Sequence, residues 1–388
     1  MSLPLEPYTV IDLTRARSGP TCVRQLADMG AKVIQVWARE ETGGDFPRRG
    51  FDSLNLHRNK RSMTLDLKSP RGVEILKRLV AKADVVVENF RPDVKHRLGI
   101  DYETLSKLNP RLIYGSISGF GQTGPYRDRP GYDQIAQGMG GLMSVTGLLG
   151  QGPVRVGIPI ADLTAGLFCA LGILVALLER EKSKKGQYVE TSLLQAQIFM
   201  LDFQAARWLI AHEVPKQAGN DHPTSIPTGV FKTSDGHINI AASGQQMFRR
   251  LCEALGTEPL LEDPRFKTAP ERSKNRKTLT VELEKATSRR TSADWVELLN
   301  AKGVPSGPIL NVKETFGNEQ VQHLGLAVPV KHHALGQMRL QRPPVTLSRT
   351  PASVRTAAPD VGEHTDEILG ELGFSADDIA GLRRDKAV

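Results

Sequence analysis

Short apolar runs alternate with longer amphipathic segments through the first third of the chain. The short runs are largely apolar, as in strands buried on both faces of a sheet, and they occupy residues 10–13, 32–36, 85–87 and 112–117. The segments between them have helical periodicity, over residues 21–29, 69–83 and 101–108. Because helices that separate consecutive strands allow a parallel sheet, this rhythm predicts an α/β fold with a Rossmann-like large domain.

The pattern changes in the second half of the chain. An apolar run over 163–178 predicts a long helix, followed by a predicted strand over 188–194 and a predicted helix over 195–212. Two further strand-like segments, 229–233 and 237–241, flank Ser234-Asp235-Gly236, which is a good β-hairpin signal. Helical periodicity then covers 245–255, 272–286 and 292–301. We therefore predict a smaller α+β domain over residues 226–308.

The composition indicates an ordinary globular protein with an anionic ligand. Of its 388 residues 39% are hydrophobic and 24% charged, which is enough for a large core. The formal net charge of +8 favours an anionic partner. The basic residues are scattered between apolar segments, without a stripe interleaved with aromatic side chains. A phosphate-bearing cofactor therefore explains the charge at least as well as nucleic acid, and no nucleic-acid partner is predicted.

Three features predict a cytoplasmic enzyme without a membrane partner. The cysteines, Cys22, Cys169 and Cys252, are far apart and odd in number, which suits a reducing compartment. The first residues lack the basic and apolar regions of a signal peptide. The apolar run over 163–178 has about 16 residues, fewer than the ~20 that span a bilayer.

No HExxH or CxxC pattern is present in the sequence, so no metal site is predicted.

Asp162 is the most informative single residue. It stands at the mouth of the long apolar helix in a position like that of an N-cap, where first-turn amides and the helix dipole favour an anion. We therefore expect its carboxylate to stay ionised near neutral pH. A carboxylate held in an apolar setting is a candidate nucleophile for acyl chemistry. Taken alone, the residue could equally be a simple helix cap.

Other motifs accompany the Asp162 segment, and their order carries more information than any one of them. They are Thr14-Arg15-Ala16-Arg17-Ser18-Gly19-Pro20, Arg58-Asn59-Lys60-Arg61-Ser62, Val87-Glu88-Asn89-Phe90-Arg91-Pro92, Gly119-Phe120-Gly121-Gln122-Thr123-Gly124-Pro125, Pro130-Gly131-Tyr132-Asp133, Gly303-Val304-Pro305-Ser306-Gly307-Pro308 and Gly362-Glu363-His364-Thr365-Asp366-Glu367. In this order and spacing the chain resembles the family III CoA-transferases, which include formyl-CoA, carnitine and dicarboxylate CoA-transferases. The resemblance extends almost from end to end.

The resemblance implies an architecture that the local pattern does not show. In this family the N- and C-terminal parts form one large domain, here residues 1–225 completed by a return segment over 309–388. The smaller domain over 226–308 lies between them in the sequence. Two subunits interlock like chain links, so the resemblance implies an interlocked homodimer.

The resemblance also implies which residues hold the substrates. Coenzyme A would be a substrate rather than a tightly bound cofactor. The positions that match its binding residues are Leu65, Lys68, Asn89, Phe90, Arg91 and Arg97. Arg39 is a weaker match because it is displaced by one position, and the neighbouring Trp37 could take its place against the adenine. Ser18, Tyr132 and Asp133 would lie beside the acyl group, and the Ser18 amide is a candidate for oxyanion stabilisation.

Asp162 would then exchange acyl groups covalently, through aspartyl anhydrides and an aspartyl-CoA thioester. The loop 119–125 and Gly131-Tyr132-Asp133 look most like the dicarboxylate-using members, those that handle succinate or glutarate. Arg17 would select dicarboxylates, because its planar fork suits a second carboxylate. The alternative is that Arg17 faces solvent or pairs with a CoA phosphate.

Two alternatives remain from the sequence. An α-methylacyl-CoA racemase shares the fold and CoA site, but it needs a histidine where this chain has Tyr132, a poor proton exchanger at neutral pH. A non-catalytic CoA-binding protein would not require the intact Asp162 segment.

Overall fold

The computed structural model describes residues 2–39 and 49–388. The chain divides into two compact units. The first contains the chain up to Leu142, Val156–Ala206 and Glu319–Val388, and the second contains Met143–Arg155 and Arg207–Asn318. The sequence pattern and the family resemblance together placed 143–155, 207–225 and 309–318 in the large domain, whereas here they group with the second unit. Periodicity is a local property, so it does not tell which of two cores a connecting segment packs against.

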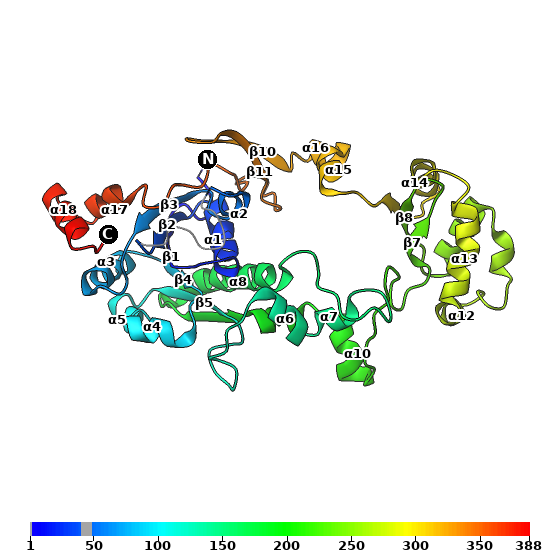
Figure 1. Ribbon diagram of the computed structural model, residues 1–388, viewed down its shortest axis with the longest axis horizontal. Coiled ribbons are helices and arrows are strands. Elements are labelled where there is room, and N and C mark those ends of the chain that lie inside the picture. The colour runs from blue at the N-terminus through cyan, green and yellow to red at the C-terminus, as the bar shows by residue number, and fades with distance from the viewer. Residues whose placement is uncertain (1, 40–48) are drawn as a thin grey trace. The chain divides into compact units, whose positions relative to one another are not determined.

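A six-stranded sheet forms the centre of the first unit (Figure 1). Its strands are β1 Thr9–Asp12, β2 Lys32–Trp37, β3 Lys60–Thr64, β4 Val85–Glu88, β5 Ile113–Ser118 and β6 Tyr188–Ser192, in the order β3-β2-β1-β4-β5-β6. Every neighbouring pair is parallel. The predicted α/β fold with a parallel sheet is therefore confirmed. The order of connection reverses between β1 and β4, which is where open sheets of this kind bind ligands.

Helices cover both faces of this sheet. On one face α1 (Ser18–Asp28) and α8 (Ile160–Ser183) pack on side chains that include Val85 and Val87. On the other face α3 (Pro70–Val80), α5 (Tyr102–Leu108) and α17 (Thr365–Glu371) pack on a core that includes Val86. Successive strand residues point to opposite faces, so both neighbours of Val86 belong to the opposite core. A strand buried on both faces therefore has the continuous apolar run seen in the sequence.

The remaining elements of the first unit are shorter or lie at its margins. They are α2 Phe51–Leu56, α4 Pro92–Leu98, α6 Asp133–Met139, α7 Leu142–Val145, α9 Leu193–Phe199, α10 Phe203–Ala211, α16 Glu319–His323, β10 Ala327–His332, β11 Gly336–Gln341 and α18 Ala376–Arg384, of which α7 and α10 cross the boundary between the units. The helix predicted over 195–212 is instead two helices, α9 and α10. Asp202 lies between them with φ +45°, a left-handed conformation that interrupts a helix.

The return segment is attached to the sheet by buried polar contacts. The His364 amide donates to the Ser62 carbonyl at 2.9 Å, and the Asp66 amide donates to the Ala387 carbonyl at 2.9 Å. Arg58 pairs with Asp28 of α1 at 2.6 Å, and both side chains are buried. Arg58 also donates to the Gln341 carbonyl at 2.8 Å. The motif Arg58-Asn59-Lys60-Arg61-Ser62 therefore connects the first third of the chain to its end.

The second unit contains a small antiparallel sheet and its own core. The strands are β7 Thr228–Lys232, β8 His237–Ala241 and β9 Ser306–Pro308, in that order. The helices are α11 Gln245–Leu255, α12 Ala269–Lys274, α13 Arg276–Thr287, α14 Ser292–Ala301 and α15 Val312–Gly317, with a 3-10 turn at Glu258–Leu261. The predicted hairpin around Ser234-Asp235-Gly236 is confirmed, because β7 and β8 pair through it.

Helix α8 is longer than its apolar run. It has 24 residues, and by length and composition it is the one helix among the described residues that could cross a membrane. Half of its most apolar stretch of 18 residues is buried inside the protein. Small residues such as Ala161 and Ala165 belong to that buried part, whereas Leu171 and Leu178 are exposed. The helix therefore serves as a core element of the first unit and also presents an apolar outer surface.

Candidate active site

The loops after β1, β4 and β5 surround a cavity of about 250 Å³ beside the first turn of α8. Its walls are Arg15, Ala16, Ser18, Asn89, Phe90, Arg91, Pro92, Ile117, Ser118, Gly119, Arg127, Arg129, Pro130, Gly131, Tyr132, Asp162 and Leu193. Several residues predicted for the site from separate parts of the sequence therefore meet here. They are Ser18, Asn89, Phe90, Arg91, Tyr132 and Asp162.

The carboxylate that caps α8 is Asp133, rather than Asp162 as the sequence suggested. Helix α8 begins at Ile160, so Asp162 lies inside its first turn. The Asp133 carboxylate accepts hydrogen bonds from the amides of Ala161 at 2.9 Å and Asp162 at 3.4 Å. It also accepts one from the Gln137 side chain at 2.7 Å. Because it accepts these first-turn amides, the buried Asp133 carboxylate occupies the anion-binding position at the start of the helix.

This arrangement changes the expected charge of Asp162. Burial, followed by the negative charge of the neighbouring Asp133, raises the pKa of Asp162 to about 7, against the opposing effect of the Arg17 guanidinium. The expectation that Asp162 is fully ionised near neutral pH is therefore corrected. The Asp162 carboxylate lies near the Asp133 carboxylate, which already accepts hydrogen bonds from the first amides of α8. A carboxylate with a pKa near neutral is more basic than an ordinary aspartate, yet still substantially ionised at physiological pH.

Close packing of α1 against α8 fixes the position of Asp162 relative to Ser18. Gly166 lies one turn beyond Asp162, and a Cβ atom at this position would be 2.4 Å from the Ser18 carbonyl oxygen. Only glycine therefore allows the two helices this approach. Ser18 is the first residue of α1, and the first amides of a helix have no intrahelical acceptor.

A buried ion pair supports the loop between β1 and α1. Asp12 at the end of β1 pairs with Lys60 at 2.8 Å, and both side chains are fully buried. Asp12 also accepts hydrogen bonds from the Thr14 amide at 2.9 Å and the Thr14 hydroxyl at 2.6 Å.

The Asn89 side chain bridges the amide and the carbonyl of Arg15, at 2.8 and 2.7 Å. Asn89 therefore has a structural role in joining two walls of the cavity.

Arg17 lies outside the cavity wall. Its guanidinium forms an ion pair with Asp52 of α2. Its charge nevertheless acts on Asp162 by lowering the pKa of that carboxyl.

Tyr132 also lines the cavity. It is the residue before α6, and it is 72% exposed. The backbones of Gly119 and Gly131 touch nearby, since a Cβ at Gly119 would lie 2.8 Å from the Gly131 Cα. The two glycines thus bring the loop after β5 against the segment that carries Tyr132 and Asp133.

The residues predicted to hold CoA fall into three groups. Asn89, Phe90 and Arg91 line the cavity. Lys68, Arg97 and Arg39 are exposed and lie outside its wall, and Arg97 pairs with Asp93 at 3.8 Å. Leu65 is fully buried in the core, so its side chain is not available to a ligand. Trp37 is covered by the Arg15 guanidinium, 4.8 Å from its ring centre.

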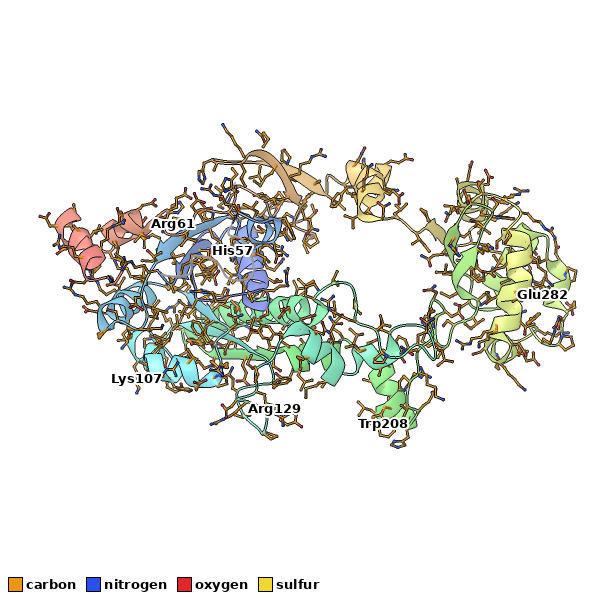
Figure 2. The ribbon with its side chains drawn as sticks, in the orientation of Figure 1. His57, Arg61, Lys107, Arg129, Trp208 and Glu282 are labelled. Atoms are coloured by element: carbon orange, nitrogen blue, oxygen red, sulfur yellow. The ribbon has the colours of Figure 1, made fainter. Side chains whose placement is uncertain are left out.

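Sequence reasoning missed three arginines of the wall, namely Arg15, Arg127 and Arg129. Arg127 and Arg129 come from the loop between β5 and α6, on which Figure 2 labels Arg129. The Arg129 guanidinium also stacks on the Tyr126 ring, 3.7 Å from its centre. The alternating run Tyr126-Arg127-Asp128-Arg129, which lies between two of the quoted motifs, was the available signal. With Arg91 these side chains give the cavity a cationic wall suited to an anionic ligand.

One cluster among the described residues has the composition of a metal site. The ligand atoms of His96, Asp101 and Glu103 lie within 4.8 Å of one another. The Asp101 carboxylate already accepts hydrogen bonds from the Thr104 amide at 2.9 Å and hydroxyl at 3.0 Å. Asp101 is therefore the N-cap of α5, as its sequence position predicts.

Comparison with known proteins identifies relatives over nearly the whole chain. The model of CoA-transferase family III matches residues 5–365. A succinyl-CoA:glutarate CoA-transferase of Mus musculus is 38% identical over 377 residues, covering 95% of this chain and 86% of the relative. A succinate–glutarate CoA-transferase of Agrobacterium fabrum is 38% identical over 384 residues, covering 95% of this chain and 96% of the relative. A solved CAIB/BAIF family protein of Brucella suis has a TM-score of 0.85 at 35% identity, covering 96% of this chain and 100% of that protein.

Proposed function

This chain belongs to CoA-transferase family III, and from that premise we propose that it moves CoA from an acyl-CoA to a dicarboxylic acid such as succinate or glutarate. Both relatives are named for glutarate and for succinate or its CoA thioester. The observation that carries the proposal is the position of Asp162, a carboxylate on the wall of the same cavity that Asn89, Phe90 and Arg91 line.

In the proposed reaction Asp162 is the acyl acceptor. Its carboxylate oxygen attacks the thioester carbonyl, the C–S bond breaks, and CoA leaves as a thiolate. The thiolate attacks the aspartyl carbonyl of the resulting anhydride, which releases the donor acid and leaves CoA on Asp162 as a thioester. The acceptor carboxylate then displaces the thiolate and forms a second anhydride. Attack of the thiolate on the acceptor carbonyl releases the product thioester and restores the Asp162 carboxylate.

The environment of Asp162 supports this role. A nucleophile must be ionised and sufficiently basic, and a pKa of about 7 provides both at neutral pH. The anhydrides hydrolyse if water reaches them, so a small cavity favours transfer over hydrolysis. The Ser18 amide supports the tetrahedral intermediates by its position in the first turn of α1 beside the cavity.

CoA would approach from the side of the loop after β4. Open parallel sheets bind ligands where the strand order reverses, which in the order β3-β2-β1-β4-β5-β6 is between β1 and β4. Arg91 lies on the cavity wall there, and Lys68, Arg97 and Arg39 supply exposed positive charge for phosphate groups.

Arg17 remains the proposed selector of dicarboxylates. Its charge acts on Asp162, which supports a position near the reacting carboxylate. Because the guanidinium pairs with Asp52, a second substrate carboxylate would have to compete with that residue.

The two alternatives are not favoured. A racemase needs a second proton-transfer group opposite Asp162. The matching position holds Tyr132, and a tyrosine is a poor proton exchanger at neutral pH. The family and the two relatives above are CoA-transferases, which disfavours a protein that only binds CoA.

We also propose a cytoplasmic homodimer. An apolar stripe along α8, formed by Leu167, Leu171, Val175 and Leu178, is exposed in the single chain. The four residues are spaced by three or four positions and therefore share one helix face, which a second copy of the chain would cover.

The deciding experiment compares the wild type with Asp162→Ala in CoA exchange from succinyl-CoA to a panel of carboxylic acids. The variant should bind CoA normally in calorimetry but lose exchange by several orders of magnitude, about 10⁴-fold or more. Hydroxylamine with succinyl-CoA should modify the wild type at Asp162. Asp377→Ala, which changes an exposed first-turn aspartate of α18, is the matched control and should retain full activity. Exchange by Asp162→Ala at the wild-type rate would contradict the mechanism.

A further inference from the structure

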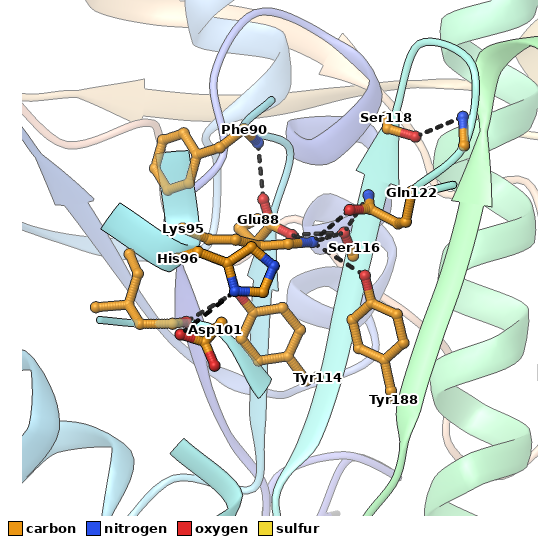
Figure 3. A network of polar contacts seen from close by, with 12 residues as sticks. Glu88, Phe90, Lys95, His96, Asp101, Tyr114, Ser116, Ser118, Gln122 and Tyr188 are labelled. Atoms are coloured by element: carbon orange, nitrogen blue, oxygen red, sulfur yellow. Dashed lines mark hydrogen bonds and ion pairs between the residues drawn. The ribbon is translucent and has the colours of Figure 1, made fainter. Parts of the chain in front are cut away.

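A buried cluster of polar side chains lies beneath the loops that form the cavity (Figure 3). At its centre is Lys95 of α4, which is almost fully buried. Its ammonium donates to Glu88 Oε1 at 3.0 Å, Ser116 Oγ at 3.0 Å, Gln122 Oε1 at 2.8 Å and Tyr188 Oη at 3.0 Å. An ammonium has three protons, so these four acceptors share them. The cluster joins side chains from β4, β5, β6, α4 and the loop after β5.

The cluster contains a buried ion pair. Glu88 at the end of β4 is fully buried, and it accepts hydrogen bonds from the Ser116 hydroxyl at 2.5 Å as well as from Lys95. Burying two charges costs desolvation energy, and replacing a buried ion pair by apolar side chains of similar volume is often neutral or stabilising. Stability alone is therefore a weak explanation for a charged pair at this position.

One arm of the cluster reaches the CoA-side loop, residues 89–91. The second carboxylate oxygen of Glu88 accepts the Phe90 amide at 2.8 Å. Asn89, the residue between them, holds the Arg15 backbone through two hydrogen bonds. The cluster thus sets the conformation of the loop that lines the CoA side of the cavity.

The other arm reaches the acyl-side loop, residues 119–122. Gln122 accepts from Lys95 and donates to Ser116 Oγ at 3.0 Å. The Gly121 amide donates to Ser118 Oγ at 2.9 Å (Figure 3). At the start of this loop Gly119 touches Gly131, which precedes Tyr132 and Asp133. The position of the acyl-side loop is therefore transmitted to Asp133, which accepts the Ala161 and Asp162 amides at the start of α8.

We propose that Lys95 is a positioning residue whose ammonium couples the CoA-side loop to the acyl-side loop. CoA bound against residues 89–91 then further restrains residues 119–122 through Glu88, Lys95 and Gln122, and so steadies the segment that carries Tyr132 and Asp133. The inference rests on the proposed function, since it takes CoA as the ligand of the CoA-side loop. Lysine suits this role because one ammonium satisfies acceptors from several directions.

Gln122→Met tests the coupling, because it removes the connection to the acyl-side loop and leaves the Lys95–Glu88 pair in place. Tyr188→Phe is the matched control: it also removes one hydrogen bond from Lys95, but on β6 rather than on a loop. Hydrogen exchange of both loops is measured by mass spectrometry with and without free CoA. In the wild type and in Tyr188→Phe, CoA should slow exchange in both loops. In Gln122→Met it should slow exchange in residues 89–91 alone.

Steady-state kinetics of CoA transfer add a second readout. Gln122→Met should lower kcat about tenfold or more with the KM for succinyl-CoA within about twofold of the wild type, whereas Tyr188→Phe should keep both values. Equal losses of kcat in the two variants, with melting temperatures lowered by the same amount, would show that the cluster only stabilises the fold. CoA-dependent protection of residues 119–122 that survives in Gln122→Met would overturn the coupling. Hydrogen exchange needs no turnover, so a wild type that binds CoA without transferring it would refute the proposed function and leave this test intact.

Discussion

At the scale of single residues, the proposed chemistry depends on the different positions of two carboxylates, Asp133 and Asp162, at the start of α8. Asp133 accepts hydrogen bonds from the Ala161 and Asp162 amides, and the half-buried Asp162 carboxylate is left beside a like charge. The helix dipole therefore stabilises the residue that positions the helix rather than the proposed nucleophile. This division makes Asp162 more basic than an ordinary aspartate and links its reactivity to pH.

We predict that CoA transfer falls as the pH drops through about 7. Attack requires the ionised carboxylate, and the pKa of Asp162 is raised to about 7, so protonation removes the nucleophile below that pH. A profile of kcat/KM against pH should level off on the alkaline side and decline about tenfold per unit on the acid side. Asp133→Asn keeps an oxygen for the Ala161 amide but removes the like charge, and it should move the midpoint to lower pH. An unchanged or higher midpoint in that variant would contradict the assignment.

Arg17→Leu should act on substrate choice and on the same pH profile. Loss of the positive charge should raise the pKa of Asp162 and shift the midpoint of the profile to higher pH. If Arg17 holds a second carboxylate, activity should fall for succinate and glutarate and persist for monocarboxylic acids, with CoA affinity little changed. Steady-state kinetics with matched acids of both classes measure the difference. An equal fall for all acids, or weaker CoA binding, would rule out selection by Arg17.

At the scale of elements, the approach of α1 to α8 decides whether Ser18 and Asp162 face the same cavity. Gly166→Ala places a Cβ 2.4 Å from the Ser18 carbonyl, so the helices must separate. Overpacking of this kind costs about 1–3 kcal/mol, and we expect a lower melting temperature together with a lower kcat. Gly370→Ala in α17 is the control, because a Cβ there meets no atom within 4 Å. It should be neutral or slightly stabilising, and equal effects of the two variants would contradict the packing argument.

At the scale of the whole molecule, the exposed stripe on α8 predicts self-association. Replacing Leu171 and Leu178 by glutamate places charges on that face and should dissociate the dimer in analytical ultracentrifugation. Val281→Glu, at an exposed apolar side chain of α13, is the matched control and should leave the mass unchanged. A wild type that sediments as a monomer would refute the proposed homodimer.

The sequence by itself determined the fold class and the family. Apolar runs predicted five of the six parallel strands, and the hairpin signal at Ser234-Asp235-Gly236 located the antiparallel pair of the second unit. Both signals are local, because the period of apolar residues reflects which face of each element is buried. The ordered motifs also located Asp162, Ser18, Asn89 and Tyr132, which the structure brings to one cavity.

Only the tertiary structure decided which charges meet. Asp133 lies 28 positions before the Ala161 amide that it accepts, Arg17 is 35 positions from Asp52, and Lys60 is 48 positions from Asp12. Periodicity contains no information on such pairs, because they depend on the order of the strands and on the paths of the loops. The pKa of Asp162 and the four partners of Lys95 depend on burial and on neighbours contributed by separate elements. Both exist only because the fold brings β1, β4, β5, β6 and α8 together.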